Sequence, residues 1–513
     1  MRGIRSQGHI PNLRIGHFQA QARQLTSQAF GRATGGNSDR RQRRFYFLPE
    51  PQEGVSGMSL MYDQKIGRLS QDCQVEAVQA FQPVWDRLIL VTIIMSLSLL
   101  AYTSITGGIF QPLFYYARTA QWARFVIRPS VIWGLTGSVL LVFRTFLWFW
   151  YKPFAPSEIA NAPFLTVIIP VYNEGPMVEK SIDSAATARY CRDKLEIIVI
   201  DDGSKDDTWK YIMRAALRYP GLVKPVRFPE NRGKRAALEE GFLRARGEIA
   251  VTVDSDSVIE HNALLAMVGP FRDAKVGAVA GKVAVYNKED GIFPRMLHVR
   301  YVLSFDFLRA AQSTYGSVYC CPGALSAYRL SVVREVLDRW MKQTFLGERC
   351  TYGEDRSMTN FILSQGYDTV YQRTAVVHTV APTTYAKMTR MYLRWDRSYI
   401  KEELRLFRIL WKRPLLSRLV TLADVCVRNL RFPISYAVLG LLVFMCMHEP
   451  GTILRLMFAI GLMSFLNALY YIRSERSWNF IYGICYSYFS TFTLFWIFPY
   501  ALFSLRSRSW MTR

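Results

Sequence analysis

The stretch LTVIIP at residues 165–170 is followed by EIIVI at 196–200 and EIAVTV at 248–253. Each is a short apolar run of the kind that forms a strand buried on both faces, and the segment between the first two has the length of a helix. This alternation predicts βαβ units and therefore an α/β fold with a largely parallel sheet. Ligands of such sheets bind where the strands end, so we examined the residues that follow each run.

Two carboxylates follow the third run, as Asp254-Ser255-Asp256. With one residue between them, the side chains of Asp254 and Asp256 can share one hard cation, Mg²⁺ or Mn²⁺, and the diphosphate bound to it. The metal would neutralise a departing nucleoside diphosphate. Acidic pairs with this spacing are also common in ordinary loops and helix caps, so the interpretation depends on the neighbouring motifs.

Three further polar motifs occupy turns: DDGS at 201–204, NRGKR at 231–235 and GEDR at 353–356. The first suits a base or ribose, although an ordinary acidic turn would look the same. In the second, Lys234 and backbone N–H groups at a helix start can bind phosphate; a solvated basic helix face is the alternative. In the third, Glu354 and Asp355 form an acidic pair, and Asp355 is our candidate general base. It can also serve as a helix N-cap.

Composition indicates a membrane protein. The chain has 513 residues, 50% of them hydrophobic, and a formal net charge of +24. Such a charge suits nucleic acid or anionic lipid and substrates, but arginines concentrate at residues 40–44 and beside the apolar segments, as a positive-inside bias predicts. The eight cysteines have no CxxC spacing, which fits a reducing cytosolic face, and we predict no structural zinc.

Five segments are apolar enough to be membrane helices. They are Leu88–Ile105, Val131–Trp150, Phe432–Met447, Ile453–Ile472 and Trp478–Leu505. Arg144 interrupts the second, where it must pair with protein or extend towards the headgroups, and we favour the latter. The last segment is too long for one upright crossing and too short for two, so it is either a tilted span or a bent re-entrant pair. Residues Lys387–Trp411 have helical apolar spacing and many cations, which predicts a helix at the membrane interface.

The motifs, in their order along the chain, resemble the processive family-2 glycosyltransferases, in particular hyaluronan synthases and rhizobial chitooligosaccharide synthases. The resemblance covers about residues 85–513. It rests on PVYNE (170–174), DDGS, NRGKR, DSD (254–256), CPGALSAYR (321–329), GEDR and LRWDRSY (393–399). It implies a GT-A-like domain that takes a UDP-sugar at a cytosolic site and elongates a polysaccharide at the cell membrane.

The resemblance also implies roles for individual residues. Tyr172, Glu174, Asp202, Lys234 and Asp254 would bind the nucleotide, Asp254 and Asp256 the metal, and Asp355 with Glu354 would form the catalytic pair. Arg394 and Trp395 would support the pyrophosphate and the acceptor sugar, and Cys321 and Gly323 would line the acceptor site. Trp395 is equally well explained as an interfacial anchor.

Two motifs depart from the family pattern. The family's QxxRW motif begins here with Met391, so contacts ascribed to that glutamine are in doubt. The final WMTR resembles the family's WGTR, and we expect Trp510, Thr512 and Arg513 to close over the bound donor; a basic tail on anionic lipid is the alternative.

The expected organisation has five parts. They are a basic tail without regular structure (1–84), two transmembrane helices (85–155), the glycosyltransferase domain (156–382), interfacial helices (383–431) and a C-terminal membrane region (432–513).

Three classes of function are compatible with this organisation. A processive synthase would use UDP-GlcNAc, with or without UDP-GlcA, and bind the growing polysaccharide and the bilayer. A non-processive enzyme would instead charge a lipid phosphate. A nucleic-acid-binding protein would explain the charge but not the motifs, so we expect no nucleic acid partner. The sequence does not decide the oligomeric state.

Overall fold

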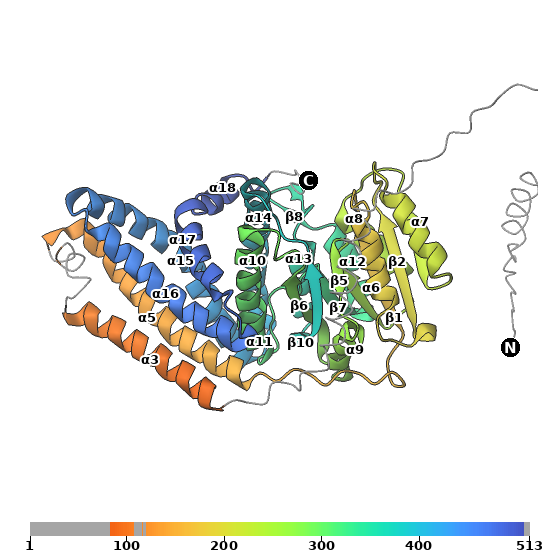
Figure 1. The fold of residues 1–513 in the computed structure, drawn as a ribbon, viewed down its shortest axis with the longest axis horizontal. Helices are drawn as coiled ribbons and strands as arrows, with labels where there is room; N and C mark the ends of the chain where they lie inside the picture. Colours follow the sequence, from red (N-terminus) through yellow and green to blue (C-terminus); the bar gives the residue numbers. More distant parts are fainter. Residues whose placement is uncertain (1–82, 107–114, 116–118, 507–513) are drawn as a thin grey trace, which may run out of the picture. The chain divides into compact units, whose positions relative to one another are not determined.

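The computed structural model describes residues 83–106, 115 and 119–506 (Figure 1). In the sequence, an α/β domain lies between N-terminal and C-terminal groups of long helices. In space, the C-terminal helices return to pack beside the N-terminal ones, on one side of the domain. The glycosyltransferase-type α/β domain and the flanking apolar helices predicted from the sequence are therefore both present.

The domain is built on one eight-stranded sheet in the order β3-β2-β1-β4-β7-β6-β10-β5. Strands β1, β2, β3 and β4 are parallel, β7 runs antiparallel to β4 and β6, and β5 runs antiparallel to β10. A separate hairpin pairs β8 (Thr344–Phe345) with β9 (Glu348–Arg349). The strands of the main sheet are β1 (Leu165–Val171), β2 (Leu195–Asp201), β3 (Val223–Arg227), β4 (Ile249–Val253), β5 (Ser257–Ile259), β6 (Val276–Val285), β7 (Leu325–Arg329) and β10 (Asp368–Thr379).

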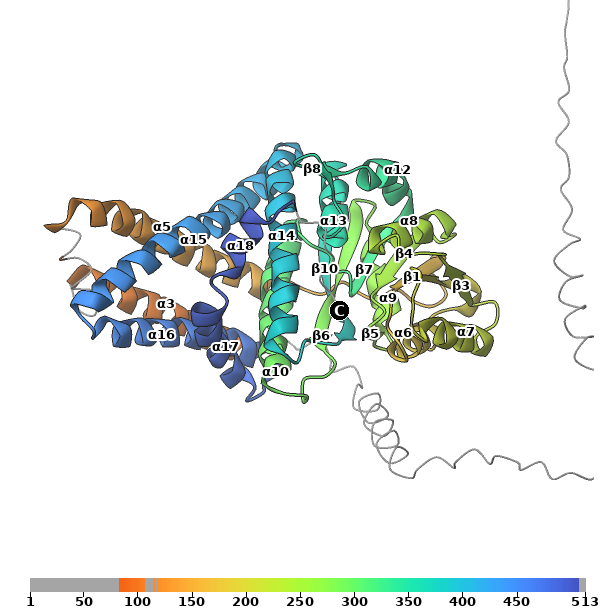
Figure 2. The same ribbon diagram turned by 90° about the horizontal axis from the view of Figure 1, so that it is seen from above.

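The three apolar runs identified in the sequence are β1, β2 and β4, and every residue in them is buried. Their burial follows from helices on both faces of the sheet, which is why these strands are continuously apolar (Figure 2). The helices of the domain are α6 (Met177–Ala186), α7 (Thr208–Arg218), α8 (Lys234–Arg244), α9 (Ala263–Val268), α10 (Ile292–Val302), α11 (Ala310–Ser313), α12 (Leu330–Met341) and α13 (Glu354–Ser364), with a π-helical segment, η3 (Leu303–Arg309), between α10 and α11.

The polar motifs lie at the ends of these elements, as predicted. Helix α8 begins at Lys234, directly after Gly233, whose φ of 91° is a conformation that favours glycine. Helix α13 begins at Glu354, after Gly353 with a φ of 77°. A Cβ at Gly353 would also collide with the Ser398 side chain, so this turn requires glycine for two reasons. Each glycine therefore fixes the residue at which a helix with a predicted site motif begins.

The long helix α14 (Tyr385–Ile409) confirms the helix expected over Lys387–Trp411, and the short η4 (Leu410–Lys412) follows it. The next helix, α15 (Leu415–His448), is unbroken, so the boundary we placed between residues 431 and 432 falls inside a helix. The last part of the segment expected at the interface (415–431) and the first part of the expected membrane region (432–448) thus form one continuous helix.

Within the described part of the chain, three helices are long and apolar enough to cross a membrane: α5 (Gln121–Trp150), α15 and α16 (Thr452–Glu475). Helix α3 (Pro83–Thr106) covers the expected Leu88–Ile105 span. Helix α5 begins ten residues before the predicted Val131, and its first turns include Arg124 and Arg128. The last apolar segment forms α17 (Phe480–Thr493) and α18 (Ile497–Phe503), bent by 50°, which is the bent alternative rather than one straight span.

Arg144 of α5 forms an ion pair inside the protein. Its guanidinium forms an ion pair with Asp424 of α15, and Asp424 is almost fully buried. Extension towards the headgroups, which we had favoured, is therefore wrong. An acidic partner offsets much of the cost of a buried arginine, and this pair joins an N-terminal helix to a C-terminal one.

Candidate active site

A cavity of about 500 Å³ extends from the carboxyl end of β4 to helix α15. Its wall combines the polar motifs of the α/β domain with residues of α10, α14 and α15. The predicted site residues on this wall are Lys234, Asp254, Asp256, Gly323, Glu354, Asp355, Arg394 and Trp395. Elements far apart in the sequence therefore contribute to one site.

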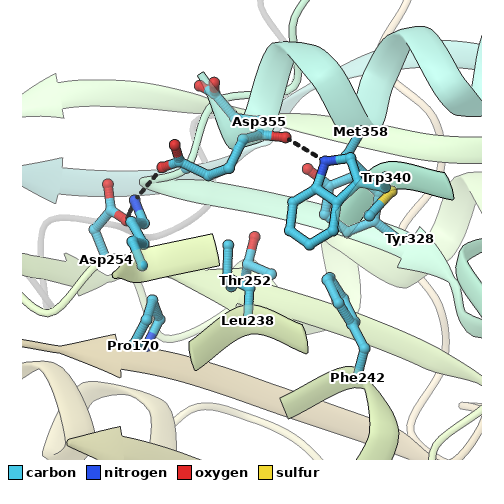
Figure 3. A pocket seen from close by; sticks show the side chains of 12 residues that line it. Pro170, Leu238, Phe242, Thr252, Asp254, Tyr328, Trp340, Asp355 and Met358 are labelled. Carbon is cyan, nitrogen blue, oxygen red and sulfur yellow. Dashed lines mark hydrogen bonds and ion pairs between the residues drawn. The ribbon is translucent and has the colours of Figure 1, made fainter. Parts of the chain in front are cut away.

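Lys234 lies at the centre of the acidic residues. Its ammonium forms ion pairs with Asp254 and, at 3.0 Å, with Glu354 (Figure 3). Burial alone would lower the pKa of Lys234, but the two carboxylates outweigh burial and raise it, so the side chain is a permanent cation. A cation held at the mouth of the β4 loop is well placed to receive phosphate oxygens.

Glu354 and Asp355 share one turn, but their pKa values shift in opposite directions. Burial opposes the charge of Glu354, yet Lys234 overcomes this effect and holds the pKa of Glu354 below its ordinary value. Burial, and then the charge of Glu354, raises the pKa of Asp355. Asp355 accepts a hydrogen bond from the backbone N–H of Arg356 at 2.7 Å and contacts the Cys320 thiol at 3.6 Å. A carboxylate with a raised pKa is the stronger proton acceptor of the two.

The Trp340 indole lies beneath this turn. Its Nε1–H donates to the Glu354 carbonyl at 3.3 Å, and the ring is fully buried beside Tyr328 and Met358 (Figure 3). A large rigid side chain hydrogen-bonded to the turn fixes the position of both carboxyls.

The second aspartate of the DSD motif is oriented from two elements. Asp256 Oδ1 accepts hydrogen bonds from the hydroxyls of Ser257 and, on β10, Thr379, both at 3.2 Å. With Asp254 paired to Lys234, both aspartates line the same cavity. The described residues contain no cluster of three or more His, Cys, Asp or Glu side chains suited to a metal ion, so Asp254 and Asp256 could provide only part of a coordination shell.

The residues predicted to bind the nucleotide have distinct environments. Asp202 is buried, and its two oxygens accept the backbone N–H groups of Arg232 and Gly233 at 2.7 and 2.8 Å. It therefore positions the turn that precedes Lys234. Tyr172 is 39% exposed, and Glu174 accepts a hydrogen bond from Ser255 between the two motif aspartates at 3.0 Å. The hydrogen bond from Ser255 to Glu174 links the turn after β4 to the turn after β1.

Cys321, which we expected to line the acceptor site, does not line the cavity. Cys321 is fully buried, with its N–H donating to Thr359, whereas Cys320 and Pro322 line the cavity. Alternation along an extended chain explains why neighbouring side chains differ. Gly323 lines the cavity, and a Cβ there would come within 2.9 Å of the Lys234 ammonium.

Trp395 faces the cavity from α14 with 39% of its surface exposed, and its ring packs on Tyr301 and Tyr392. Met391, in the position of the family's glutamine, also lines the cavity, and the Tyr301 hydroxyl contacts its sulfur at 3.9 Å. A thioether replaces an amide there, so the donor and acceptor contacts of a glutamine side chain are lost.

Sequence reasoning missed a group of charged residues on the cavity wall: Arg300, Arg309, Asp396, Arg428 and Arg431. Among these residues, only Asp396 could have been identified from the sequence, because it directly follows the Arg394-Trp395 pair. The arginines come from helices whose relative placement the sequence does not reveal. Trp510, Thr512 and Arg513, the predicted gating residues, lie outside the described residues.

Comparisons with known proteins agree with this geometry. The family model described as glycosyl transferase family 2 matches residues 166–337. An N-acetylglucosaminyltransferase of Rhizobium sp. strain N33 is 31% identical over 356 residues, which cover 68% of this chain and 77% of the relative. Hyaluronan synthase of Streptococcus pyogenes serotype M1 is 29% identical over 389 residues, covering 74% of this chain and 90% of the synthase.

Among solved structures, a mannosyltransferase of Pyrobaculum calidifontis in complex with GDP-mannose and Mn²⁺ superposes with a TM-score of 0.51 at 22% identity, over 71% of this chain and 99% of that one. This likeness confirms the GT-A fold. With the family model and the relatives, it shows that the chain is a glycosyltransferase of family 2, similar to N-acetylglucosaminyltransferases and hyaluronan synthases, with apolar helices on both sides of its catalytic domain.

Proposed function

We propose that this enzyme transfers sugar from UDP-GlcNAc, with or without UDP-GlcA, to the end of a growing polysaccharide, with inversion and without release between cycles. The single observation that carries the proposal is the cavity, which holds Asp254 and Asp355 at one end and Arg431 and Phe432 of the apolar helix α15 at the other. A product formed at the carboxylates would already lie on a path towards the membrane helices.

The donor would bind at the carboxyl ends of β1, β2 and β4. Tyr172, Glu174 and Asp202 are proposed to hold the uridine side, and Lys234 the diphosphate. Asp254 and Asp256 offer hard oxygen ligands that suit Mg²⁺ or Mn²⁺, and the diphosphate would complete their shell. A divalent cation bound there would supply neutralisation of the leaving UDP.

Asp355 is proposed as the base that removes the proton from the acceptor hydroxyl. Its raised pKa makes it a better proton acceptor than an ordinary aspartate, and the low pKa of Glu354 keeps that neighbour ionised beside Lys234. Trp395 would stack on the acceptor ring, and Arg394 would support the pyrophosphate.

The proposed setting is a cell membrane with the catalytic domain in the cytosol, where nucleotide sugars are available. Arginine-rich sequence at residues 40–44 supports this orientation. Extrusion of the polymer through the helices would follow from repeated addition at a site that opens towards α15.

One observation favours a different acceptor. Arg300 of α10 and Arg431 of α15 line the cavity, and neither forms an ion pair with a carboxylate of the described residues. Such cations would suit a lipid phosphate, charged with a single sugar by a non-processive enzyme.

One experiment separates the two. Purified enzyme with Mg²⁺ or Mn²⁺ is given UDP-GlcNAc, UDP-GlcA and UDP-Glc, singly and in pairs, and UDP release is followed together with product size on a gel. Polymer that lengthens with time supports the processive proposal. A product limited to one lipid-linked sugar supports the alternative, and absence of UDP release with every donor overturns both.

A further inference from the structure

Asp396 stands out among the cavity residues that the proposed mechanism does not use. It follows Trp395 on α14, is half-buried, and lines the same cavity as Trp395 and Asp355. Its neighbours on the wall place it towards the membrane end of the cavity, beyond the reacting carboxylates.

The Asp396 carboxylate forms no hydrogen bond and no ion pair with any residue in the described parts of the chain. The other carboxylates of this wall differ: Asp254 and Glu354 pair with Lys234, Asp355 accepts a backbone N–H, and Asp256 accepts two hydroxyls. A half-buried carboxylate without partners is costly, and such a group is therefore expected to have a ligand.

The surroundings of Asp396 are cationic and aromatic. Arg300 and Tyr301 face the cavity from α10, Arg356 from α13 and Arg431 from α15. Burial raises the pKa of Asp396 to about 6, against the opposing influence of Arg431, Arg300 and Arg356. No arginine comes close enough for an ion pair, which leaves the carboxylate oxygens available to a ligand in the cavity.

We propose that Asp396 is a specificity-determining residue of the acceptor site, whose carboxylate accepts hydrogen bonds from the hydroxyl groups of a neutral sugar ring stacked on Trp395. This inference rests on the proposed transferase function and deepens it. Sugar hydroxyls are donors, and a carboxylate accepts such bonds with more strength than a neutral group. The aromatic face beside it supplies the apolar contact that pyranose rings prefer.

The proposal also predicts discrimination. A sugar that carries a carboxylate at this position would meet Asp396 as a like charge, which disfavours binding. Because each added sugar becomes the next acceptor ring, the ring at Trp395 is expected to be a neutral hexose or N-acetylhexosamine, and this favours a polymer built from neutral units.

The test measures direct binding of two oligosaccharides to the purified full-length enzyme: a tetramer of N-acetylglucosamine, and a tetrasaccharide with glucuronate at its non-reducing end. Asp396→Asn preserves size and removes the charge, while Asp193→Asn, at an exposed position far from the cavity wall, is the matched control. We expect Asp396→Asn to lower the affinity for the neutral tetramer about tenfold. The affinity for the uronate tetrasaccharide should stay unchanged or increase. Affinity for UDP stays constant.

A pH series adds a second readout. Affinity of the wild-type enzyme for the neutral tetramer should fall as the pH drops through about 6, where Asp396 gains its proton, and this dependence should be much weaker in Asp396→Asn.

Equal loss of both oligosaccharides in Asp396→Asn would indicate a structural role and overturn the inference, as would unchanged binding of the neutral tetramer. Weakened UDP binding would indicate that Asp396 belongs to the donor site, and this result would also overturn the inference. If the wild-type enzyme binds the tetramer but releases no UDP from any donor, the transferase proposal fails instead.

Discussion

Glu354 and Asp355 are consecutive carboxyls at the start of α13, and their pKa values move in opposite directions. Lys234 forms an ion pair with Glu354. Burial, and then the charge of Glu354, raises the pKa of Asp355. The two adjacent acids therefore have different environments, which supports the proposal that Glu354 holds Lys234 and that Asp355 takes a proton.

Asp355→Asn should retain UDP binding and lose transfer. The base acts on the acceptor, so its removal should lower kcat by a factor of about 10²–10⁴ and leave donor affinity unchanged. Single-turnover transfer and equilibrium binding of UDP measure the two quantities. If donor affinity collapses together with kcat, Asp355 belongs to the donor site.

The pH dependence of the same step has a defined sign. Because the base must be deprotonated and its pKa is raised, kcat should increase with pH through a value above that of an ordinary aspartate. The acidic limb of the kcat profile measures this value. A limb at or below the ordinary aspartate pKa would contradict the assignment.

Asp256→Asn should abolish metal-dependent UDP release. The substitution removes one charge from the proposed cation site and keeps the shape of the side chain, including an oxygen for Ser257 and Thr379. Loss of a metal ligand of this kind costs at least about 100-fold in rate. UDP release is titrated with Mg²⁺ and Mn²⁺ in the variant and in Asp193→Asn as a control. Normal release at low metal concentration would exclude Asp256 from the metal site.

Trp395→Ala should impair acceptor use and product length more than donor binding. Loss of the stacking surface should raise the KM for acceptor roughly five- to tenfold. Trp411→Ala is the matched control, because Trp411 is 60% exposed and lies outside the cavity wall. Unchanged product length with a reduced yield of protein in the membrane would support an anchoring role for Trp395.

The features that the sequence predicted are those with local causes. Buried strands, the turns that follow them and the helix at Lys387–Trp411 are encoded in runs of adjacent residues, and each is present. The acidic motifs could be assigned to one site because parallel strands end at one edge of a sheet.

The features that were missed depend on distant partners. The ion pair of Lys234 with Glu354 connects α8 with α13. Arg300 of α10 and Arg431 of α15 line the same cavity. Cys320 and Cys321 show the same limit on a smaller scale, since extended backbone fixes that they face opposite ways but not which one faces the cavity. Only packing of whole elements decides these questions.

The ion pair between Arg144 and Asp424 gives the last prediction, which concerns stability. Arg144→Met leaves Asp424 as a buried charge without its strongest partner and should lower the free energy of unfolding by about 3–5 kcal/mol. Arg144→Met combined with Asp424→Leu should recover most of this loss, because Arg428 keeps its ion pair with Glu403. Arg455→Met is the control, since its pair with Glu449 is exposed and should contribute less than about 1 kcal/mol.

These stabilities are compared by unfolding the purified variants in the same detergent, with retention of UDP binding as a check on the α/β domain. The physical basis is that a buried pair is costly mainly when it is broken on one side, so the double variant must be more stable than the single one. If Arg144→Met is as stable as the wild type, the guanidinium reaches water or lipid headgroups, and the contact with Asp424 does not hold α5 against α15.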